Sequence, residues 1–327
     1  MNHLTLAAGL FLGAGSALAE TPVLTVYAPD YFGSEWGPGP AIETAFEAEC
    51  VCDLQFLTGD VMPRLLLEGA RTKADAVIGL NTDVTKQARE TGLFAPHGQD
   101  TGDLTMPIEW TDDVFLPFNW GYTAFVYDNT KITNPPASFE ALLNSDEDWK
   151  IVIQDPRSSI SGLALMLWVK SIYGDEAEAA WEKLALKILT MTAGWSESYG
   201  MFTDGEADMV LSYTTSPAYH LIAEDDDTKS AAIFEEGHYF MAELVGKIAG
   251  TDQPELADQF MDFILSEAFQ SIIPEGNWSY PAKLDASKLP EKFALLGEPE
   301  TAIFYSEDEA AALRDPALEE WLSALGR

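Results

Sequence analysis

The sequence predicts an α/β protein made of two lobes around a cleft, with a parallel-core sheet in each lobe. Short apolar segments alternate with helical patterns in one series before residue 91 and in a second series over residues 151–214. Such alternation is typical of parallel sheets covered by helices. Two long apolar segments, 115–128 and 238–249, flank the second series, and we expect them to be strands that cross between the lobes at a hinge. A chain of 327 residues is long enough for two such lobes.

The elements of each series follow from their apolar periodicity. In the first series, strands are expected at residues 23–28, 52–57 and 75–80, and helices at 40–49, at 61–73 and from the third strand to Glu90. In the second, strands are expected at 151–156 and 209–214, and helices at 161–173 and 177–189. We therefore expect one lobe to comprise residues 20–115 and 238–280, and the other to comprise residues 116–237 and 281–327.

Residues 1–19 have the pattern of a secretory signal peptide. An apolar segment over residues 6–12 is followed by small residues, and Ala17-Leu18-Ala19 fits the cleavage rule. A membrane anchor is the alternative, but no later segment approaches the roughly 18 unbroken apolar residues of a membrane helix. We expect export to the periplasm and a mature protein that begins near Glu20 and is not inserted in the membrane.

Charge and cysteine content narrow the classes of partner. The 54 acidic and 18 basic residues give a net charge of −36, which argues against nucleic acid as a partner. The acidity can serve solvation, the attraction of a cationic ligand, or both. Cys50 and Cys52 are the two cysteines. A Cys-x-Cys loop is tight, and we interpret it as a structural or partly oxidised pair rather than a metal site, because other ligands are missing.

Three predicted strands end in segments that start helices. The tract over residues 211–219, LSYTTSPAY, contains Ser216 as an expected N-cap, followed by Pro217 at the first helical position. Gly59 and Asp60 follow the second strand, and Asp60 is a candidate cap. Three serines follow the strand at 151–156, around the amide of Ile160. Helix N-termini at strand ends bind small anions, so these segments predict a shared cleft.

Aromatic residues predict a second kind of contact. Trp36, Trp195 and Trp278 lie among glycine, serine and proline rather than in helical apolar stripes. Tryptophans in loops are candidates for contact with flat rings or cations. No nucleophile elbow is recognisable, and His238 is expected to belong to a crossing strand rather than to act as a general base.

Together these residues resemble the thiamine-binding periplasmic proteins, the substrate-binding components of thiamine ABC importers. The resemblance covers nearly the whole mature chain, and its motifs include PVLTVYAPDYF, WGPGP, KADAVIGL, QDPRSS, GWSESYG, GEADMVLSYTTSPAYH and PEGNWSYP. It implies the two-lobed type II periplasmic binding protein fold, which is also that of ferric-binding proteins and thiaminase I.

The resemblance implies two groups of ligand contacts. Contacts with the hydroxyl or phosphate end of thiamine fall on Gly59, Asp60, Ser159, the amide of Ile160, Tyr213, Thr214, Thr215 and Ser216. Contacts with its rings fall on Trp195, Tyr219 and Trp278, with Asp30 facing the positive thiazolium or the aminopyrimidine. Pro29 stands where some members carry a stacking tyrosine, and Tyr31 is the candidate to replace it.

The function implied is the binding of thiamine, and also of its mono- and diphosphate, by lobe closure, followed by delivery to the permease and ATPase of an inner-membrane importer. We expect a monomer that needs no cofactor and catalyses no chemical step. Two alternatives remain open at this point. One is a thiaminase-like enzyme, which would need a nucleophilic cysteine in the cleft. The other is an importer protein for a polyamine or ferric iron, although the adjacent tyrosines of iron binders are missing here.

Overall fold

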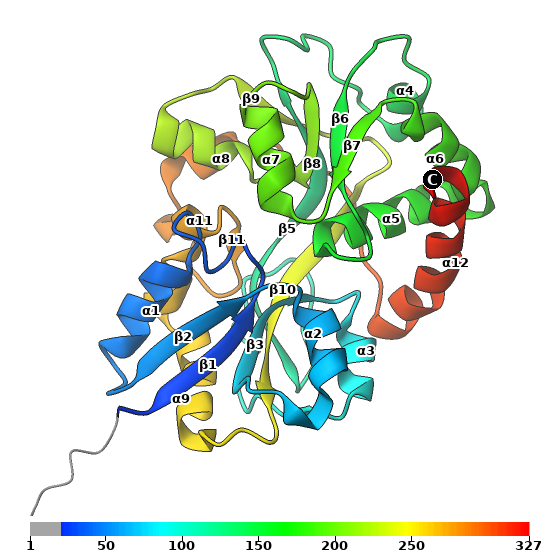
Figure 1. Ribbon diagram of the computed structural model, residues 1–327. Coiled ribbons are helices and arrows are strands. Elements are labelled where there is room, and N and C mark those ends of the chain that lie inside the picture. The colour runs from blue at the N-terminus through cyan, green and yellow to red at the C-terminus, as the bar shows by residue number, and fades with distance from the viewer. Residues whose placement is uncertain (1–20, 327) are drawn as a thin grey trace, which may run out of the picture.

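Two lobes share one continuous, mixed sheet in the computed structural model, which describes residues 21–326. The strand order is β2-β1-β3-β10-β5-β8-β6-β7. Figure 1 shows β5 and β10 running between the lobes. The signal-peptide prediction concerns residues 1–19, which lie outside the described residues. In the described part of the chain, no helix has the length and apolarity needed to cross a membrane.

The first lobe contains the predicted β-α-β-α-β series. Its strands β1, β2 and β3 pair in parallel, because each is followed by a helix that returns the chain. Strands and helices of this lobe before β5 are β1 (Val23–Ala28), α1 (Gly39–Glu47), β2 (Asp53–Thr58), α2 (Val61–Glu68), η1 (Gly69–Arg71), β3 (Ala76–Asn81), α3 (Thr85–Glu90) and β4 (Phe94–Ala95). Those after β10 are α9 (Pro254–Ile264), α10 (Glu267–Gln270) and α11 (Ile273–Gly276).

The two crossing strands are confirmed as β5 (Phe115–Asp128) and β10 (His238–Ile248). They pair with each other in antiparallel orientation, and β10 also pairs with β3 of the first lobe. Beyond Tyr122, β5 leaves β10 and pairs with β8 of the second lobe. His238 is buried at the start of β10, as expected for a strand residue. The hinge therefore consists of hydrogen-bonded strands rather than of loops.

The second lobe contains a parallel core of β8, β6 and β7. Its elements are α4 (Phe139–Leu143), β6 (Ile151–Gln154), α5 (Ile160–Tyr173), η2 (Gly174–Glu176), α6 (Ala177–Ala185), β7 (Ile188–Thr192), α7 (Trp195–Thr203), β8 (Met209–Tyr213), α8 (Pro217–Tyr219), η3 (His220–Glu224) and β9 (Lys229–Ala232). The C-terminal elements are β11 (Tyr280–Pro281), η4 (Ala286–Lys288), η5 (Glu291–Leu295), β12 (Ala302–Ile303) and α12 (Glu307–Leu325).

One predicted helix is wrong over its last four residues. The helix expected over residues 177–189 ends at Ala185, and residues 188–192 form β7 beside β6. The sequence ILTMT of β7 is rich in β-branched residues, which favour a strand once a neighbouring edge is available for pairing. The helical pattern extends into the strand because Leu186 and Leu189 continue the apolar spacing, although both are exposed.

The C-terminal helix α12 connects the lobes on the side away from α1 (Figure 1). It packs on α5 and α6 of the second lobe and also contacts α3 of the first. Asp308 accepts from Lys86 at 2.6 Å, and Glu307 lies 3.3 Å from Arg89. Ion pairs this exposed contribute about 0–1 kcal/mol each, so they orient α12 more than they stabilise it.

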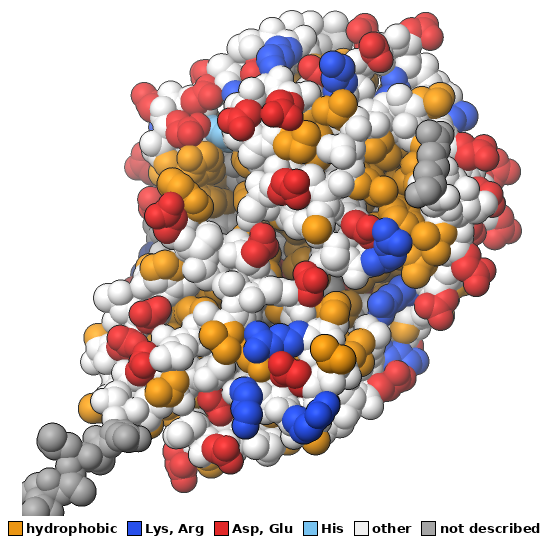
Figure 2. Space-filling view, viewed as in Figure 1, with side chains coloured by type: hydrophobic (Ala, Val, Ile, Leu, Met, Phe, Trp, Pro, Cys, Tyr) orange, Lys and Arg blue, Asp and Glu red, His pale blue; other side chains and the backbone are white. Residues whose placement is uncertain are grey.

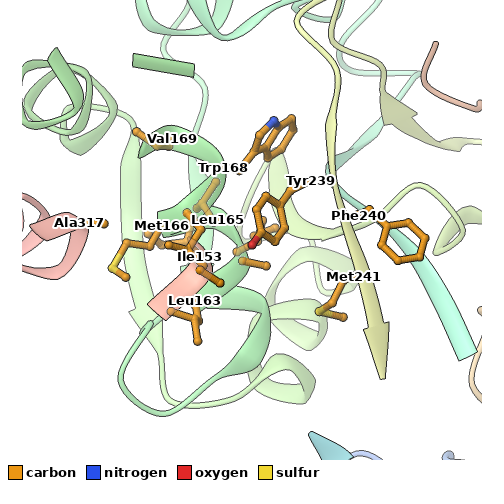
Figure 3. Close-up of a cluster of buried hydrophobic side chains, with 14 of the residues drawn as sticks. Ile153, Leu163, Leu165, Met166, Trp168, Val169, Tyr239, Phe240, Met241 and Ala317 are labelled. Carbon is orange, nitrogen blue, oxygen red and sulfur yellow. The ribbon is translucent and has the colours of Figure 1, made fainter. Parts of the chain in front are cut away.

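A buried aromatic cluster around Trp168 packs α5 against β10. Trp168 of α5 packs beside His238 at the start of β10, with ring centroids 4.8 Å apart, and Figure 3 shows Tyr239 and Phe240 on opposite sides of that strand. The Trp168 ring lies 4.5 Å from that of Phe139, and its Nε1 donates to the Gly237 carbonyl at 3.0 Å. This packing fixes the second lobe to the end of a crossing strand.

The sequence indicates a structural role for the two cysteines and a solvating or ligand-attracting role for the acidic side chains. Cys50 and Cys52 form a disulfide and are both buried, consistent with a structural pair. Acidic side chains are spread over both lobes on the face shown in Figure 2 rather than gathered in one patch. This distribution favours solvation as one role of the negative charge.

Replacing Trp168 by Ala should lower the free energy of unfolding by about 3–5 kcal/mol, because a fully buried aromatic side chain is lost from a packed core. Trp36→Ala is the matched control, since Trp36 is 78% exposed and should change stability by less than about 0.5 kcal/mol. Urea unfolding measures both variants. Equal losses in the two variants would contradict the packing described here.

Candidate functional site

Two adjoining cavities lie between the lobes. The first, of about 480 Å³, is lined by the starts of α2 and α5, and we call it the helix-start cavity. The second, of about 450 Å³, has four tyrosines and four tryptophans in its lining, and we call it the aromatic cavity. Tyr31, Ser161 and Trp195 line both. The two cavities are therefore parts of one cleft with chemically different ends.

The helix-start cavity contains the predicted residues Asp30, Gly59, Asp60, Ser159 and Ile160. Ser159 Oγ, from one of the three serines around the Ile160 amide, accepts from the Gly162 amide at 3.5 Å and caps α5. Asp60 precedes α2, but its carboxylate caps none of the described amides, so that part of the prediction is wrong. The carboxylate is left free to contact other groups.

Gly59 has a structural reason to be glycine. Its φ of +146° is rare for residues with a side chain, and nothing lies within 4 Å of the position that a Cβ would occupy. The backbone at the end of β2 is thus open to the cavity. A ligand can approach its peptide groups closely there.

Two arginines also line the helix-start cavity. Arg157 forms a forked pair with Asp155, with Nη2 at 2.5 Å from Oδ2 and Nε at 2.9 Å from Oδ1, and this contact lowers the pKa of Asp155. Arg314 of α12 donates to the Gln87 side chain at 3.0 Å. Two aspartates, Asp30 and Asp60, line the same cavity, so its charged side chains balance formally.

Asp30 reaches from the end of β1 toward the second lobe. A Cβ at Gly194 would lie 3.3 Å from its Oδ2, so the two lobes approach each other closely here. Burial raises the pKa of Asp30, while a hydrogen bond with Ser196 opposes this effect. The side chain is thereby placed beside Trp195.

Trp195 is the first residue of α7, rather than part of a loop as the flanking residues suggested. Its ring stacks on Tyr199 at 4.6 Å between centroids, and its Nε1 donates to Ser212 Oγ at 2.9 Å. These contacts fix the ring, which lines both cavities. A rigid aromatic face costs little conformational entropy when a ligand binds.

Tyr219 and Trp278 form another wall of the aromatic cavity. Their rings meet edge to face at 5.3 Å, and Trp278 has a φ of +52°, which is uncommon for a non-glycine residue. The backbone strain is typical of functional positions. Trp36 also lines this cavity and is 78% exposed, so it lies at the rim.

The tract over residues 211–219 differs in detail from the prediction. Ser216 caps no amide of α8. Its Oγ instead lies 2.6 Å from Ser212 Oγ and accepts from the Tyr213 amide at 3.2 Å, because α8 spans only three residues. Thr214 and Thr215 are buried and line neither cavity. Tyr213 and Ser216 do line the aromatic cavity, and the Tyr213 hydroxyl lies 2.5 Å from Ser161 Oγ.

Sequence reasoning missed a buried carboxyl in the aromatic cavity. Glu243 of β10 is 4% exposed, and burial raises its pKa to about 7. Its Oε2 accepts from Asn119 at 2.5 Å and from Asn277 at 2.8 Å, and its Oε1 contacts the Tyr31 hydroxyl. One signal could have found it, since Glu243 is the acid within the otherwise apolar strand segment YFMAELVG.

A second buried carboxyl, Asp83, follows β3. It accepts from the Tyr239 hydroxyl at 2.6 Å and from Asn81 at 2.8 Å. Burial raises its pKa to about 6. Asp83 lines neither cavity and serves to join β3 to the crossing strand β10.

A group of residues near η3 could hold a metal ion by spacing alone. Donor atoms of His220, Glu224 and Asp226 lie within 4.8 Å of one another. The imidazole is already used, because Nε2 pairs with the Tyr199 hydroxyl at 3.0 Å and Nδ1 with Glu224 at 2.6 Å. We assign these contacts to the support of the Tyr199 ring.

Similarity to known proteins decides the family. Residues 71–310 match the family of bacterial extracellular solute-binding proteins. A thiamine-binding periplasmic protein of Salmonella typhimurium is 47% identical over 97% of this chain and 98% of its own length. This chain belongs to the thiamine-binding periplasmic protein family. The protein of that name from Escherichia coli is also 47% identical, over 94% of each chain.

Solved structures agree with this placement. A periplasmic thiamin-binding protein superposes with a TM-score of 0.91 at 47% identity, covering 94% of this chain and 97% of its own. Iron-bound HitA of Pseudomonas aeruginosa superposes with a TM-score of 0.74 at 20% identity, covering 93% of this chain and 99% of its own. The second likeness shows the fold alone, and it confirms the predicted type II periplasmic binding protein architecture.

The buried Asp83 should make stability depend on pH. Its ordinary pKa is 3.8, whereas the folded protein holds the proton up to pH of about 6. The folded state therefore binds more protons than the unfolded state between these values, and stability falls as pH rises through this window. In Asp83→Asn, this fall should be smaller by about 3 kcal/mol.

Urea unfolding of both proteins at pH 4 and pH 7 measures the difference. Asp83→Asn keeps the acidic surface of the wild type, so repulsion between surface carboxylates is the same in both proteins. The difference between their pH profiles therefore reports on Asp83 alone. Parallel pH profiles in the two proteins would contradict the assignment.

Proposed function

We propose that this protein binds thiamine and its phosphate esters in the periplasm and delivers them to an ABC importer of the inner membrane. One observation carries the proposal, namely the division of the cleft. An aromatic cavity whose charged side chains are acidic is joined to a cavity that holds two arginines, two aspartates and a helix N-terminus. The relatives described above, which are named for thiamine binding, support the same ligand.

The aromatic cavity suits the two rings of thiamine. Trp195, Tyr219 and Trp278 offer faces for a flat aminopyrimidine and for the permanently cationic thiazolium. A cation over an aromatic face gains about 0.5–2 kcal/mol. Glu243 adds a carboxyl group to this cavity, and Asp30, which bonds to Ser196 next to Trp195, adds one from the adjoining helix-start cavity; both complement the positive charge of the ligand.

The helix-start cavity suits the hydroxyethyl end and its phosphates. The 14-residue helix α5 begins at Ile160, so its first amides have no acceptors within the helix. Ser159 and Arg157 lie beside them at the cavity. A phosphate would accept from these groups, and the helix dipole would favour its charge.

The protein is proposed to act as a monomeric binding protein without a cofactor, not as an enzyme. A thiaminase-like reaction would need a cysteine nucleophile, and within residues 21–326 both cysteines are bonded in a disulfide outside the two cavities. Lobe closure about β5 and β10 would enclose the ligand, and both lobes would then present it to the permease. Residues 1–19 would direct export.

Calorimetric titration with thiamine should show saturable binding by the wild type. Trp195→Ala should weaken it more than about tenfold, because the ring contributes a rigid face to both cavities. Trp149→Ala is the control, since Trp149 lines neither cavity and should stay within about twofold. A wild type that shows neither heat of binding nor a thiamine-dependent rise in melting temperature would refute the proposal.

A further inference from the structure

Glu243 is a buried carboxyl of the hinge strand that also lines the ligand cleft. It lies in the hinge strand β10, opposite Asn81 of β3 on one side and Asn119 of β5 on the other. The ladder with β5 shifts its register between Glu243 and Leu244, and the ladder with β3 shifts one residue later, between Leu244 and Val245. Such bulges redirect a side chain. Here the carboxyl lines the aromatic cavity while remaining 4% exposed.

The groups facing Glu243 carry no positive charge. Asn119 of β5 and Asn277 after α11 are neutral donors, and Tyr31 after β1 offers a hydroxyl. The other titratable groups that line the cavity are Tyr199 of α7, Tyr213 of β8, Tyr219 of α8 and Glu224 of η3. No Lys, Arg or His occurs among the described residues of this lining. Burying a charged carboxylate without a cationic partner costs free energy. The cavity lining provides no such partner for Glu243, so a cationic ligand could fill that role.

The hydrogen bonds allow the carboxyl to exist in two protonation states. Both asparagine amides donate to Oε2, whereas Oε1 contacts only the Tyr31 hydroxyl among the groups that bond to it. A hydroxyl can donate to a carboxylate or accept from a carboxylic acid. A proton can therefore reside on Oε1 or leave it while the two amide contacts persist.

We propose that Glu243 binds the cationic ring of the cargo and releases a proton to solvent when the ring enters, so that cargo capture is coupled to deprotonation of the hinge. This inference rests on the proposed function and adds a specificity-determining residue to it. A neutral ring of the same shape would gain no ion pair at Glu243. The hinge carboxyl would thus favour cations over neutral analogues.

The sign of the pH dependence follows from burial. Burial raises the pKa of Glu243 to about 7 in the absence of a ligand. A cation beside the carboxyl lowers its pKa, since the charged form gains a partner. Binding below pH 7 must then displace a proton, and affinity should rise with pH up to about 7 and level off above it.

Calorimetry with thiamine at pH 6.5, in buffers of different ionisation enthalpy, counts the protons released. The wild type should release about three-quarters of a proton, the fraction protonated for a pKa of about 7. Glu243→Gln should release none, should bind at least about tenfold more weakly at pH 8, and should lose the pH dependence. Asp83→Asn is the control, because it removes another buried carboxyl with a raised pKa that lines neither cavity. Proton release should persist in it.

If Glu243→Gln does not fold, the pH profile of thiamine binding by Tyr31→Phe provides the test. This variant retains the carboxyl but removes its hydroxyl partner, so the midpoint of the pH profile should move to higher pH. An unmoved midpoint would overturn the inference. A wild type that binds thiamine without releasing a proton would overturn it too, while leaving the proposed function intact. A wild type that does not bind thiamine at any pH would overturn both.

Discussion

The antiparallel pairing of β5 with β10 is the constraint on which the rest of the structure depends. The paired strands link the lobes, because β10 also pairs with β3 of the first lobe and β5 also pairs with β8 of the second. The carboxyl ends of β1, β2 and β6 therefore face one space. Backbone hydrogen bonds resist shear, so the lobes can rotate about these strands without losing register. The paired strands therefore determine where the cleft lies, and they limit its closure to rotation of the lobes about β5 and β10.

The chemistry of the cleft follows from which segments meet there. The starts of α2 and α5 bring backbone amides and Arg157 to one end. The start of α7 and the segment after α11 bring tryptophans to the other. A ligand that is cationic and flat at one end and anionic at the other satisfies both ends at once. A small inorganic ion would contact only one of the two cavities.

The parts that could be predicted from the sequence are those with local signals. Long apolar runs identified β5 and β10, and three serines before an apolar segment indicated where α5 begins. Prediction failed where tertiary contacts decide. Residues 188–192 became a strand because β6 offered an edge, and Ser216 turned to Ser212 instead of capping. Glu243 was missed because its partners are 34 to 212 residues away in the chain.

The orientation of one bound ligand tests the account most directly. A crystal structure with thiamine monophosphate should place the phosphate at the start of α5, within hydrogen-bond distance of Ser159 and the Ile160 amide, and both rings among Trp195, Tyr219 and Trp278. The arginines and the start of α5 at one end, and the aromatic rings with Glu243 at the other, predict this orientation. A ligand with its phosphate in the aromatic cavity, or bound outside both cavities, would contradict the account.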